Sequence, residues 1–322
     1  MKRIEKVAVI GMGALGLLFG DRIHESLGDD NFAFLMDEER ASKHRADIYK
    51  INGEEKHYPI ATPSDLSFVP DLIIFATKFG GLESAGELAK RIAGPETVYI
   101  AVLNGIISEE ILGRFLPSEK IVDCVAIGMD AMRDGTDLDY KSMGNLQIGI
   151  SQRGCGGGSR EGTEATRAAR VQEEAFASLK EFFDRVGVPY EVPEDIRRSM
   201  WIKFMMNVGI NQACMVYECP YKDALSLSHI YDDLYDSMHE VMAIGKAEGI
   251  NISEEDYDRG IAIFHTLHPD SYPSMRQDAL AKRKSEVDLF AGTVMNIAKK
   301  HGIPVPVNER FYNIIKEMEA KY

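Results

Sequence analysis

Three polar side chains recur at intervals of four residues within one apolar segment of the sequence. Lys203, Asn207 and Asn211 lie in the stretch W-I-K-F-M-M-N-V-G-I-N, in which most other residues are apolar. On a helix, residues four apart form a row along one face. A helix that is apolar all round is buried, so an ammonium and two amides must be hydrogen-bonded or line a wet cavity. The row is therefore either a structural polar seam or the wall of a binding site.

A second motif is a glycine-rich turn that follows the short apolar run at residues 7–10. It reads G-M-G-A-L-G. In this pattern the first glycine permits a tight turn, the second lets the backbone approach a pyrophosphate, and the third allows close packing of helix on strand. Its place between a strand and a helix predicts a dinucleotide-binding site; the alternative is a turn that serves packing alone. The candidate cofactor-binding residues of the turn are Gly11, Met12, Gly13, Ala14, Leu15 and Gly16.

Asp37 follows the next predicted strand and bears on the choice of cofactor. A carboxylate at this place accepts hydrogen bonds from the ribose hydroxyls of adenosine, favours NAD(H) and repels a 2′-phosphate. Asp37 also suits a helix start, because acidic side chains favour the first turn. The choice between NAD(H) and NADP(H) stays open, since four basic residues that could neutralise a 2′-phosphate follow closely: Arg40, Lys43, His44 and Arg45.

Other polar residues stand where ligands often bind. Lys78 and Asn104 follow two further predicted strands, and ligands of doubly wound sheets bind beyond the carboxyl ends of the strands. In the second half of the chain, Ser274 follows a proline and Glu286 lies among apolar residues of an expected helix. The simpler readings are a helix N-cap for Ser274 and a surface carboxylate for Glu286. His265-x-x-His268 has metal-like spacing without a third ligand, so no metal site is expected.

The elements that must position these residues fall into two groups. Short apolar strands alternate with helical patterns up to about residue 192, which predicts a parallel doubly wound sheet. Beyond Pro193 the pattern is helical throughout. We therefore expect an α/β chain: a Rossmann-type dinucleotide-binding domain at residues 1–193 and an all-helical substrate and catalytic domain at residues 194–322. The expected strands are residues 7–10, 32–36, 72–76, 98–103, 121–127, 146–150 and 188–192; the expected helices are residues 14–27, 81–93, 107–115, 168–186, 194–217, 228–249, 253–265, 276–301 and 306–320.

Composition narrows the class of protein. The chain has 322 residues, of which 45% are hydrophobic, enough for two ordinary domains. A net charge of −14 argues against a nucleic-acid partner. No apolar run approaches the roughly 20 residues of a membrane span. The cysteines form no metal-type or disulfide pattern, and residues 151–162 read as a glycine-rich surface loop. We expect a cytoplasmic protein without a membrane partner.

With these motifs assembled, the chain resembles the ketopantoate reductase (2-dehydropantoate 2-reductase) family over nearly its whole length. The glycine turn is shared by many dehydrogenases, whereas the Lys/Asn/Asn row and S-M-x-Q-D are much more specific. The matching motifs are G-x-G-A-x-G at 11–16, T-K at 77–78, L-N-G at 103–105, W-x-K-x-x-x-N-x-x-x-N at 201–211, S-M-x-Q-D at 274–278, S-E-x-D at 285–288 and G-I-P-V-P at 302–306.

The resemblance implies an activity and a set of roles. The family reduces a small 2-keto acid, ketopantoate, to the 2-hydroxy acid with NADPH, on the route to pantothenate and coenzyme A, in a cleft between its two domains. By resemblance, Lys203 is the proton donor and Glu286 lies beside it and beside the cofactor. Substrate binding is implied for Asn104, Asn207, Asn211, Tyr221 and Ser274, and further cofactor contacts for Lys78, Asn104 and Ala131.

Two residues depart from the family pattern and keep alternatives open. Asp37 stands where an arginine or another residue compatible with a 2′-phosphate is usual, and Tyr221 stands where a small polar residue is usual. The alternatives are a related 2-hydroxyacid dehydrogenase acting on another 2-keto acid, and a protein that senses NAD(P) without turnover. The methionine-rich helical half could also pack on a second copy, so a homodimer is one expectation.

Overall fold

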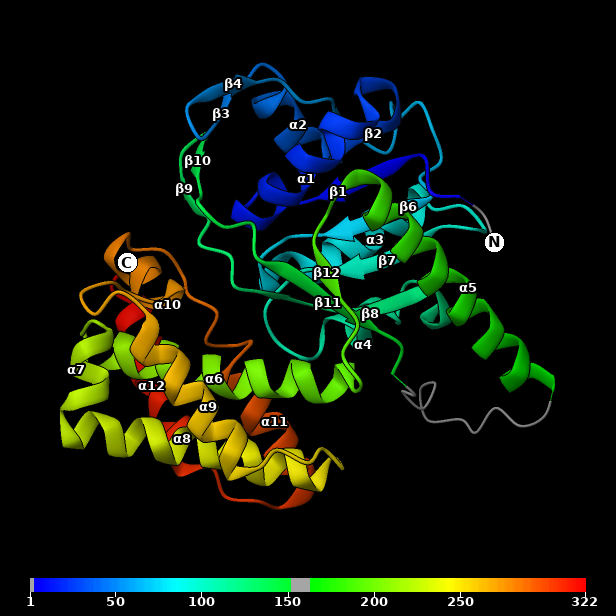
Figure 1. Ribbon diagram of the computed structural model, residues 1–322. Coiled ribbons are helices and arrows are strands. Elements are labelled where there is room, and N and C mark those ends of the chain that lie inside the picture. Colours follow the sequence, from blue (N-terminus) through cyan, green and yellow to red (C-terminus); the bar gives the residue numbers. More distant parts are fainter. Residues whose placement is uncertain (1–2, 152–162) are drawn as a thin grey trace. The chain divides into compact units, whose positions relative to one another are not determined.

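The computed structural model describes residues 3–151 and 163–322 (Figure 1). The chain divides into two compact units, Met1–Ile196 and Arg197–Tyr322. The domain boundary expected from the sequence, between residues 193 and 194, falls three residues before this division. Residues 152–162, which make up most of the expected glycine-rich loop and include Cys155, lie outside the described residues.

Unit 1 is built on an eight-stranded sheet with the order β12-β11-β8-β7-β6-β1-β2-β5. Strands β5, β2, β1, β6, β7 and β8 pair in parallel, so the predicted doubly wound α/β sheet is confirmed. The strands of the unit are β1 (Val7–Ile10), β2 (Phe32–Leu35), β3 (Tyr49–Ile51), β4 (Glu54–Lys56), β5 (Ile60–Ala61), β6 (Leu72–Phe75), β7 (Val98–Ala101), β8 (Ile121–Ile127), β9 (Met132–Asp134), β10 (Asp137–Asp139), β11 (Asn145–Gly149) and β12 (Tyr190–Glu191). Its helices are α1 (Ala14–Leu27), α2 (Glu38–His44), α3 (Leu82–Ile92), α4 (Ser108–Leu112) and α5 (Thr163–Val186).

Both faces of the sheet are covered, which explains the uninterrupted apolar strands in the sequence. In β1, Val7 and Val9 belong to the core cluster under α1 and α5, whereas Ala8 and Ile10 belong to the cluster under α3 and α4. Figure 1 shows these helices on the two sides of the sheet. Because side chains alternate between faces, a strand buried on both faces needs apolar residues at every position.

One strand runs against the expected direction. The predicted sixth strand is present as β11, but it pairs antiparallel with β8, through Leu146 opposite Ala126. No helix lies between β8 and β11, so the chain returns without the crossover that a parallel neighbour requires. The sequence pattern of a buried strand does not record its direction.

A small second sheet was absent from the sequence-based prediction. Its order is β4-β3-β10-β9, with β3 and β10 parallel and the outer pairs antiparallel. The strands have three residues each and are largely polar, so they carry little hydrophobic pattern. Tyr49, Ile51 and Leu138 nevertheless join the core cluster under α1. The sheet is thus part of unit 1 and lies beside α1.

Among the described residues of unit 2 the regular elements are all helices, as predicted. Its helices are α6 (Ile196–Val216, which begins at the division), α7 (Tyr221–Ser226), α8 (Ser228–Ala247), α9 (Glu254–Thr266), α10 (Ser274–Leu280), α11 (Ala291–His301) and α12 (Pro306–Glu319). The short helix α7 was not predicted.

The expected single helix at residues 276–301 is wrong. The structure has two helices, α10 and α11, and the ten residues between them are not helical. Lys282 adopts φ +51, and the Arg283 amide donates to the carbonyl of Asp278. This is the hydrogen-bond pattern of a helix that ends in a left-handed residue, a place normally taken by glycine. With lysine there, the sequence gives no sign of the break.

Candidate functional site

The glycine-rich turn lies between β1 and α1, as predicted, and its glycines differ in what they permit. Gly11 has φ +109, and a Cβ there would lie 2.6 Å from the backbone of Ala76. A Cβ on Gly16 would lie 2.0 Å from the Gly11 carbonyl oxygen. A Cβ on Gly13 would meet nothing closer than 3.7 Å. Packing inside the protein therefore requires two of the glycines, whereas the space beside Gly13 is open.

Two further features of this turn fit a bound dinucleotide. Helix α1 begins after Gly13 without a side-chain cap and without an acidic residue in its first turn, so its first N–H groups face no carboxylate there. Thr77 follows β6 beside Gly11, and its buried Oγ1 has no hydrogen-bond partner in the described part of the chain. Free N–H groups, an unsatisfied hydroxyl and open space are what a pyrophosphate would use.

The predicted cofactor residues of unit 1 share one edge of the sheet. Because β7, β6, β1 and β2 are parallel neighbours, their carboxyl ends meet at this edge. Asn104, Lys78, Gly11 and Asp37 follow these four strands in that order. Asn104 is half-buried, Lys78 is exposed, and Ala131 is half-buried just before β9. The chain changes direction across the sheet between β1 and β6, which is where ligands bind in such folds.

Asp37 is the N-cap of α2, so the reading of this residue as a helix start is confirmed. Its carboxylate accepts from the Arg40 amide at 2.8 Å and lies 3.5 Å from Nε of Arg40. The basic residues considered for a 2′-phosphate each have an acidic partner: Arg40 with Asp37, Lys43 with Glu39, His44 with Asp47, and Arg45 with Asp65. These cations are thus less available to a phosphate than the sequence suggests.

Arg133 is a basic residue at the glycine turn that sequence reasoning missed. It lies on β9, and its Nη1 donates to the carbonyl oxygen of Met12. Tyr49 of β3 reaches the same residue, with its hydroxyl 3.7 Å from the Met12 sulfur. The Asp134-Gly135 pair is a hairpin signal that could have placed Arg133 next to a turn. The sequence could not have shown that the hairpin lies over residue 12.

In unit 2, the row on α6 forms as predicted and is tied to α10. Asn211 is buried, and its Nδ2 donates to Oδ1 of Asn207 at 3.4 Å. Oδ1 of Asn211 accepts from Oγ of Ser274 at 3.0 Å and from the Met275 amide at 3.3 Å. Asn207 and Lys203 are half-buried. Since the Met275 amide can only donate, it fixes which end of the Asn211 side chain is the oxygen.

Ser274 and Tyr221 lie near Asn211 in different ways. Ser274 is the first residue of α10, whose N-cap is Pro273, so the N-cap reading of Ser274 is wrong. Tyr221 begins α7 and is partly buried, and its amide donates to the carbonyl of Ser271. Burial, with a smaller contribution from Cys214, raises the pKa of the Tyr221 phenol. Cys214 is one helical turn beyond Asn211, so the phenol stands near this end of the row.

Glu286 is not in a helix, which corrects the expectation from the sequence. It lies in the irregular segment between α10 and α11, where its carbonyl accepts from the Phe290 amide. The rings of Phe290 and Phe204 lie 6.3 Å apart, which packs the segment on α6 directly after Lys203. Ser285 fixes the other side, because its amide and its hydroxyl each donate to Glu319 of α12 at 2.7 Å.

A buried polar network connects α6 to α8 and α12. Nε2 of Gln212 donates to Oδ1 of Asn308 at 3.0 Å, and Nδ2 of Asn308 donates to Glu240 at 2.7 Å. Glu240 also accepts from the amides of Val307 and Asn308 at the start of α12. Burial raises the pKa of Glu240, although these hydrogen bonds oppose the shift. Each member has at least one partner, although the buried Oε1 of Gln212 has none among the described residues, and the network ties α6 to α8 and α12.

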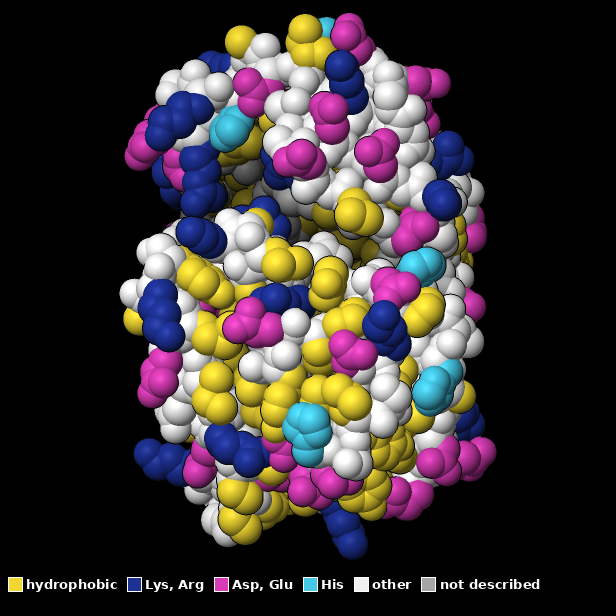
Figure 2. All heavy atoms as spheres, turned by 90° about the vertical axis from the view of Figure 1, so that its left-hand side faces the viewer, with side chains coloured by type: hydrophobic (Ala, Val, Ile, Leu, Met, Phe, Trp, Pro, Cys, Tyr) yellow, Lys and Arg dark blue, Asp and Glu magenta, His cyan; other side chains and the backbone are white. Residues whose placement is uncertain are grey.

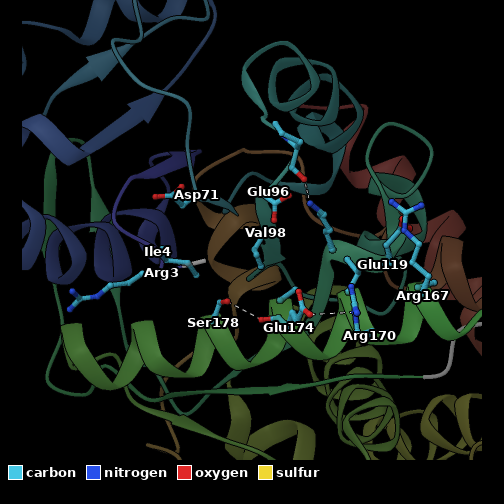
Figure 3. A pocket seen from close by; sticks show the side chains of 15 residues that line it. Arg3, Ile4, Asp71, Glu96, Val98, Glu119, Arg167, Arg170, Glu174 and Ser178 are labelled. Atoms are coloured by element: carbon cyan, nitrogen blue, oxygen red, sulfur yellow. Dashed lines mark hydrogen bonds and ion pairs between the residues drawn. The ribbon is translucent and has the colours of Figure 1, made fainter. Parts of the chain in front are cut away.

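A cavity of about 540 Å³ in unit 1 lies away from the glycine turn (Figure 3). It is lined by residues near the amino ends of the strands, such as Ile4 and Asp71, and by Arg170 and Glu174 of α5. Arg170 pairs with Glu174 at 3.5 Å, and Asp71 accepts from two backbone amides at 3.0 Å. Ligands of such sheets bind at the opposite, carboxyl ends. The cavity is therefore distinct from the candidate cofactor site.

The described residues contain neither a candidate metal centre nor a candidate membrane span. Over residues 3–151 and 163–322, no group of three or more His, Cys, Asp or Glu side chains is arranged to hold a metal ion. Over the same ranges, no helix combines the length and the apolar character needed to cross a membrane. No disulfide joins the described cysteines Cys124, Cys214 and Cys219, and all three are buried.

Known proteins resemble the chain over its whole length. A 2-dehydropantoate 2-reductase of Streptococcus pyogenes is 23% identical over 320 residues, which are 98% of each chain. Among solved structures, a D-mandelate dehydrogenase with NADH and anilino(oxo)acetate has a TM-score of 0.81 at 22% identity, over 98% of this chain and 99% of that one. A dimeric ketopantoate reductase from Staphylococcus aureus has a TM-score of 0.76 at 18% identity, over 98% and 99%.

Two family models cover both units. Residues 7–153 match the model described as Ketopantoate reductase PanE/ApbA, and residues 195–319 match Ketopantoate reductase PanE/ApbA C terminal. The first match lies within unit 1 and the second covers most of unit 2, and together they include the glycine turn and the polar row of α6. The chain is therefore a member of the ketopantoate reductase family of oxidoreductases.

Proposed function

We propose that the protein reduces the ketone of a small 2-keto acid to a 2-hydroxy acid with a nicotinamide dinucleotide. The observation that carries this proposal is the hydrogen-bonded chain from Ser274 through Asn211 to Asn207, in one row with Lys203. A structural seam would satisfy its own polar groups. Nδ2 of Asn207, however, has no hydrogen-bond partner among the described residues, and the side chain is only half-buried. It is a donor aimed by its neighbours and available to a substrate oxygen.

The proposed roles follow from charge development in the reaction. The nicotinamide supplies a hydride, and negative charge then builds on the ketone oxygen. A lysine ammonium beside that oxygen stabilises the charge and delivers the proton, which is the role we propose for Lys203. Glu286 lies in a segment that is hydrogen-bonded to α12, and we propose that it orients the ammonium of Lys203. Asn207, with Asn211 behind it, holds the substrate so that the carbonyl carbon presents one face.

Ser274 needs one rearrangement to bind a carboxylate. Its hydroxyl proton is directed to Asn211 Oδ1 at 3.0 Å, and a carboxylate offers only acceptors. We propose that the hydroxyl turns its proton to the substrate when the acid binds. The Met275 amide keeps its bond to the same oxygen at 3.3 Å, so Asn211 stays oriented during that change.

For the cofactor we propose NADH as the better donor, with NADPH as the alternative implied by the family. Asp37 stands at the end of β2, where a carboxylate pairs with ribose hydroxyls and repels a 2′-phosphate. The four nearby basic side chains are engaged with acids. Gly11, Met12, Gly13, Ala14, Leu15 and Gly16 would hold the pyrophosphate, with Lys78, Asn104 and Ala131 as further contacts.

For the substrate we propose two candidates. Ketopantoate, on the route to pantothenate, is supported by family membership. A larger 2-keto acid with an aryl group is supported by Tyr221, whose partly buried ring could pack on an aryl group where a small polar side chain could not. D-mandelate dehydrogenase, to which the fold is similar, is a relative of that kind.

The experiment is an assay of NADH and NADPH oxidation with ketopantoate, benzoylformate and pyruvate. We expect turnover with at least one acid, and we expect Lys203→Ala to lose more than ~100-fold in kcat while binding NADH as the wild type does. Lys246→Ala, on α8, is the control, since that exposed lysine is outside the row. Turnover in Lys203→Ala near the wild-type value would refute the assignment. Tight cofactor binding without reduction of any 2-keto acid would support a sensor instead.

Assembly and location complete the proposal. Exposed large apolar side chains of unit 2 include Leu227, Tyr235, Ile263 and Leu267, and Figure 2 shows hydrophobic side chains spread over one face of this unit. We propose a homodimer that buries part of this surface, and a cytoplasmic location. Sedimentation equilibrium of the purified protein at micromolar concentration tests the dimer, and a monomer would contradict it.

A further inference from the structure

Arg133 places a positive charge at the glycine turn without an acidic partner. Nη1 donates to the Met12 carbonyl, and Nε donates to the Gly135 carbonyl at 2.9 Å. Both acceptors are neutral, and none of the described carboxylates forms an ion pair with this guanidinium. By contrast, Arg40 and Arg45, which also belong to unit 1, pair with acids. An arginine with only carbonyl partners retains donors and its full charge for a further acceptor.

The surroundings of Arg133 fix the position of that charge. The side chain crosses from β9 of the small sheet to residue 12, and Tyr49 of β3 contacts the same methionine. Partial burial lowers the pKa of Arg133, while Tyr49 and Asp47 act in the opposite direction. The guanidinium stays charged at any ordinary pH. Residue 133 as a whole is exposed, so an anion can reach the guanidinium from solution.

Two features of the chain directly after residue 12 suit a phosphate. Residue 12 is followed by Gly13, where the protein leaves space, and by the uncapped start of α1. Both features are explained if an anion binds beside Met12. The ribose end of a dinucleotide belongs instead at the end of β2, where Asp37 stands. The charge of Arg133 is therefore next to the pyrophosphate position rather than the 2′-phosphate position.

We propose that Arg133 binds the pyrophosphate of the dinucleotide while it holds the small sheet beside the glycine turn. The inference rests on the proposed dinucleotide site, but it adds a contact from the β9–β10 hairpin, far from the glycine turn in sequence. Arg133 keeps its bond to the Met12 carbonyl through one nitrogen and donates to a phosphate oxygen through the other. The pyrophosphate is common to NADH and NADPH, so Arg133 contributes equally to both.

The test measures binding of ADP-ribose and 2′-phospho-ADP-ribose by isothermal titration calorimetry, without substrate or turnover. Arg133→Met removes the charge and keeps an apolar stem, and Arg133→Lys keeps the charge. A charge-assisted hydrogen bond predicts that Arg133→Met raises Kd for both ligands by the same factor, ~10- to 100-fold, and that Arg133→Lys raises it less. Arg170→Met, at the amino ends of the strands, is the control and leaves both Kd values unchanged.

Two results overturn the proposal: unchanged Kd values in Arg133→Met, or a loss confined to the 2′-phosphorylated ligand, which would move Arg133 to the ribose phosphate. If Arg133→Met fails to fold, a measurement on the wild-type protein still tests the proposal. ADP-ribose should protect Arg133 from an arginine-specific dicarbonyl reagent, as measured by peptide mass spectrometry, while Arg170 stays reactive. Absence of protection contradicts the proposal.

The outcomes also separate this inference from the proposed function. If no 2-keto acid is reduced but ADP-ribose binding depends on Arg133, the reaction is wrong and the pyrophosphate contact stands. If a 2-keto acid is reduced and substitution of Arg133 leaves the Kd of ADP-ribose unchanged, only the pyrophosphate contact is wrong.

Discussion

Gly13→Ala tests whether the open space in the glycine turn exists for a ligand. Gly13 has φ −72 and ψ −173, an extended conformation that alanine adopts without strain. The nearest atom to an added Cβ is the Ala76 carbonyl oxygen at 3.7 Å, an ordinary van der Waals contact. The folded protein alone therefore tolerates the methyl group.

The magnitude follows from two small and opposing effects. Replacing glycine by alanine in a compatible conformation stabilises a protein by about 0.4–1 kcal/mol through the unfolded chain. Gly13 is also the N-cap of α1, where alanine is less favourable than glycine by up to about 1 kcal/mol. We expect the free energy of unfolding to change by less than about 1 kcal/mol. Binding should suffer, because losing one hydrogen bond to a charged phosphate costs about 1.5–3 kcal/mol, or a ~10- to 150-fold rise in Kd.

Gly16→Ala is the matched comparison within the same turn. Its Cβ would lie 2.0 Å from the Gly11 carbonyl oxygen and 3.0 Å from the Gly11 carbonyl carbon, both backbone atoms that cannot swing away. Overpacking of this kind costs about 1–3 kcal/mol or more, and we expect the upper end. Gly16→Ala should thus lose stability first, whereas Gly13→Ala should lose binding alone.

The assay combines urea unfolding with a fluorescence titration of NADH and NADPH on both variants. Two results would refute the reasoning: Gly13→Ala binding both cofactors as the wild type does, or Gly13→Ala losing as much stability as Gly16→Ala. The first would make the turn a packing device. The second would mean that the space beside Gly13 is needed by the protein itself.

Three further predictions concern other parts of the chain. Asp37→Arg should raise the NADPH-to-NADH ratio of kcat/KM by at least ~10-fold, because it replaces repulsion of a 2′-phosphate by attraction. An unchanged ratio would show that Asp37 does not determine the choice of cofactor. Ser274→Ala removes one hydrogen-bond donor from Asn211 Oδ1 and removes the proposed carboxylate contact. KM for the keto acid should therefore rise ~10-fold or more, with NADH binding unchanged. A KM equal to that of the wild type would contradict the contact. Asp256→Asn should lower the free energy of unfolding by about 2–4 kcal/mol at pH 7, because the buried carboxylate holds Arg198, Arg259 and Ser253. Desolvation alone would raise the pKa of Asp256, but these hydrogen bonds outweigh it and hold the pKa below 3.8. The ionised carboxylate therefore stabilises the fold fully above about pH 3.8. The difference in urea midpoint between Asp256→Asn and the wild type should shrink only as the pH falls below that value. A difference that is constant from pH 7 to pH 3 would contradict this assignment.

Most of the fold was predictable because the strands are buried on both faces and the helices of unit 2 are long. The continuous apolar run at residues 7–10, the glycine turn and the four-residue spacing on α6 each report a local geometry that holds wherever the segment lies. The direction of β11 and the short polar strands β3, β4, β9 and β10 carry no such local signal. They depend on which segments the tertiary structure brings into pairing.

The sequence by itself determined the types of residue available for chemistry: a lysine and two amides in a row, a glycine turn, and a carboxylate after β2. Tertiary structure decided how they are held. It made Ser274, for which a helix N-cap was the simpler reading, a donor for Asn211. It also placed Glu286 outside a helix and brought Arg133 to Met12 across more than a hundred residues of chain. Spacing along one element fixes which side chains share a face. Contacts between elements depend on packing of the whole core, which no single segment encodes.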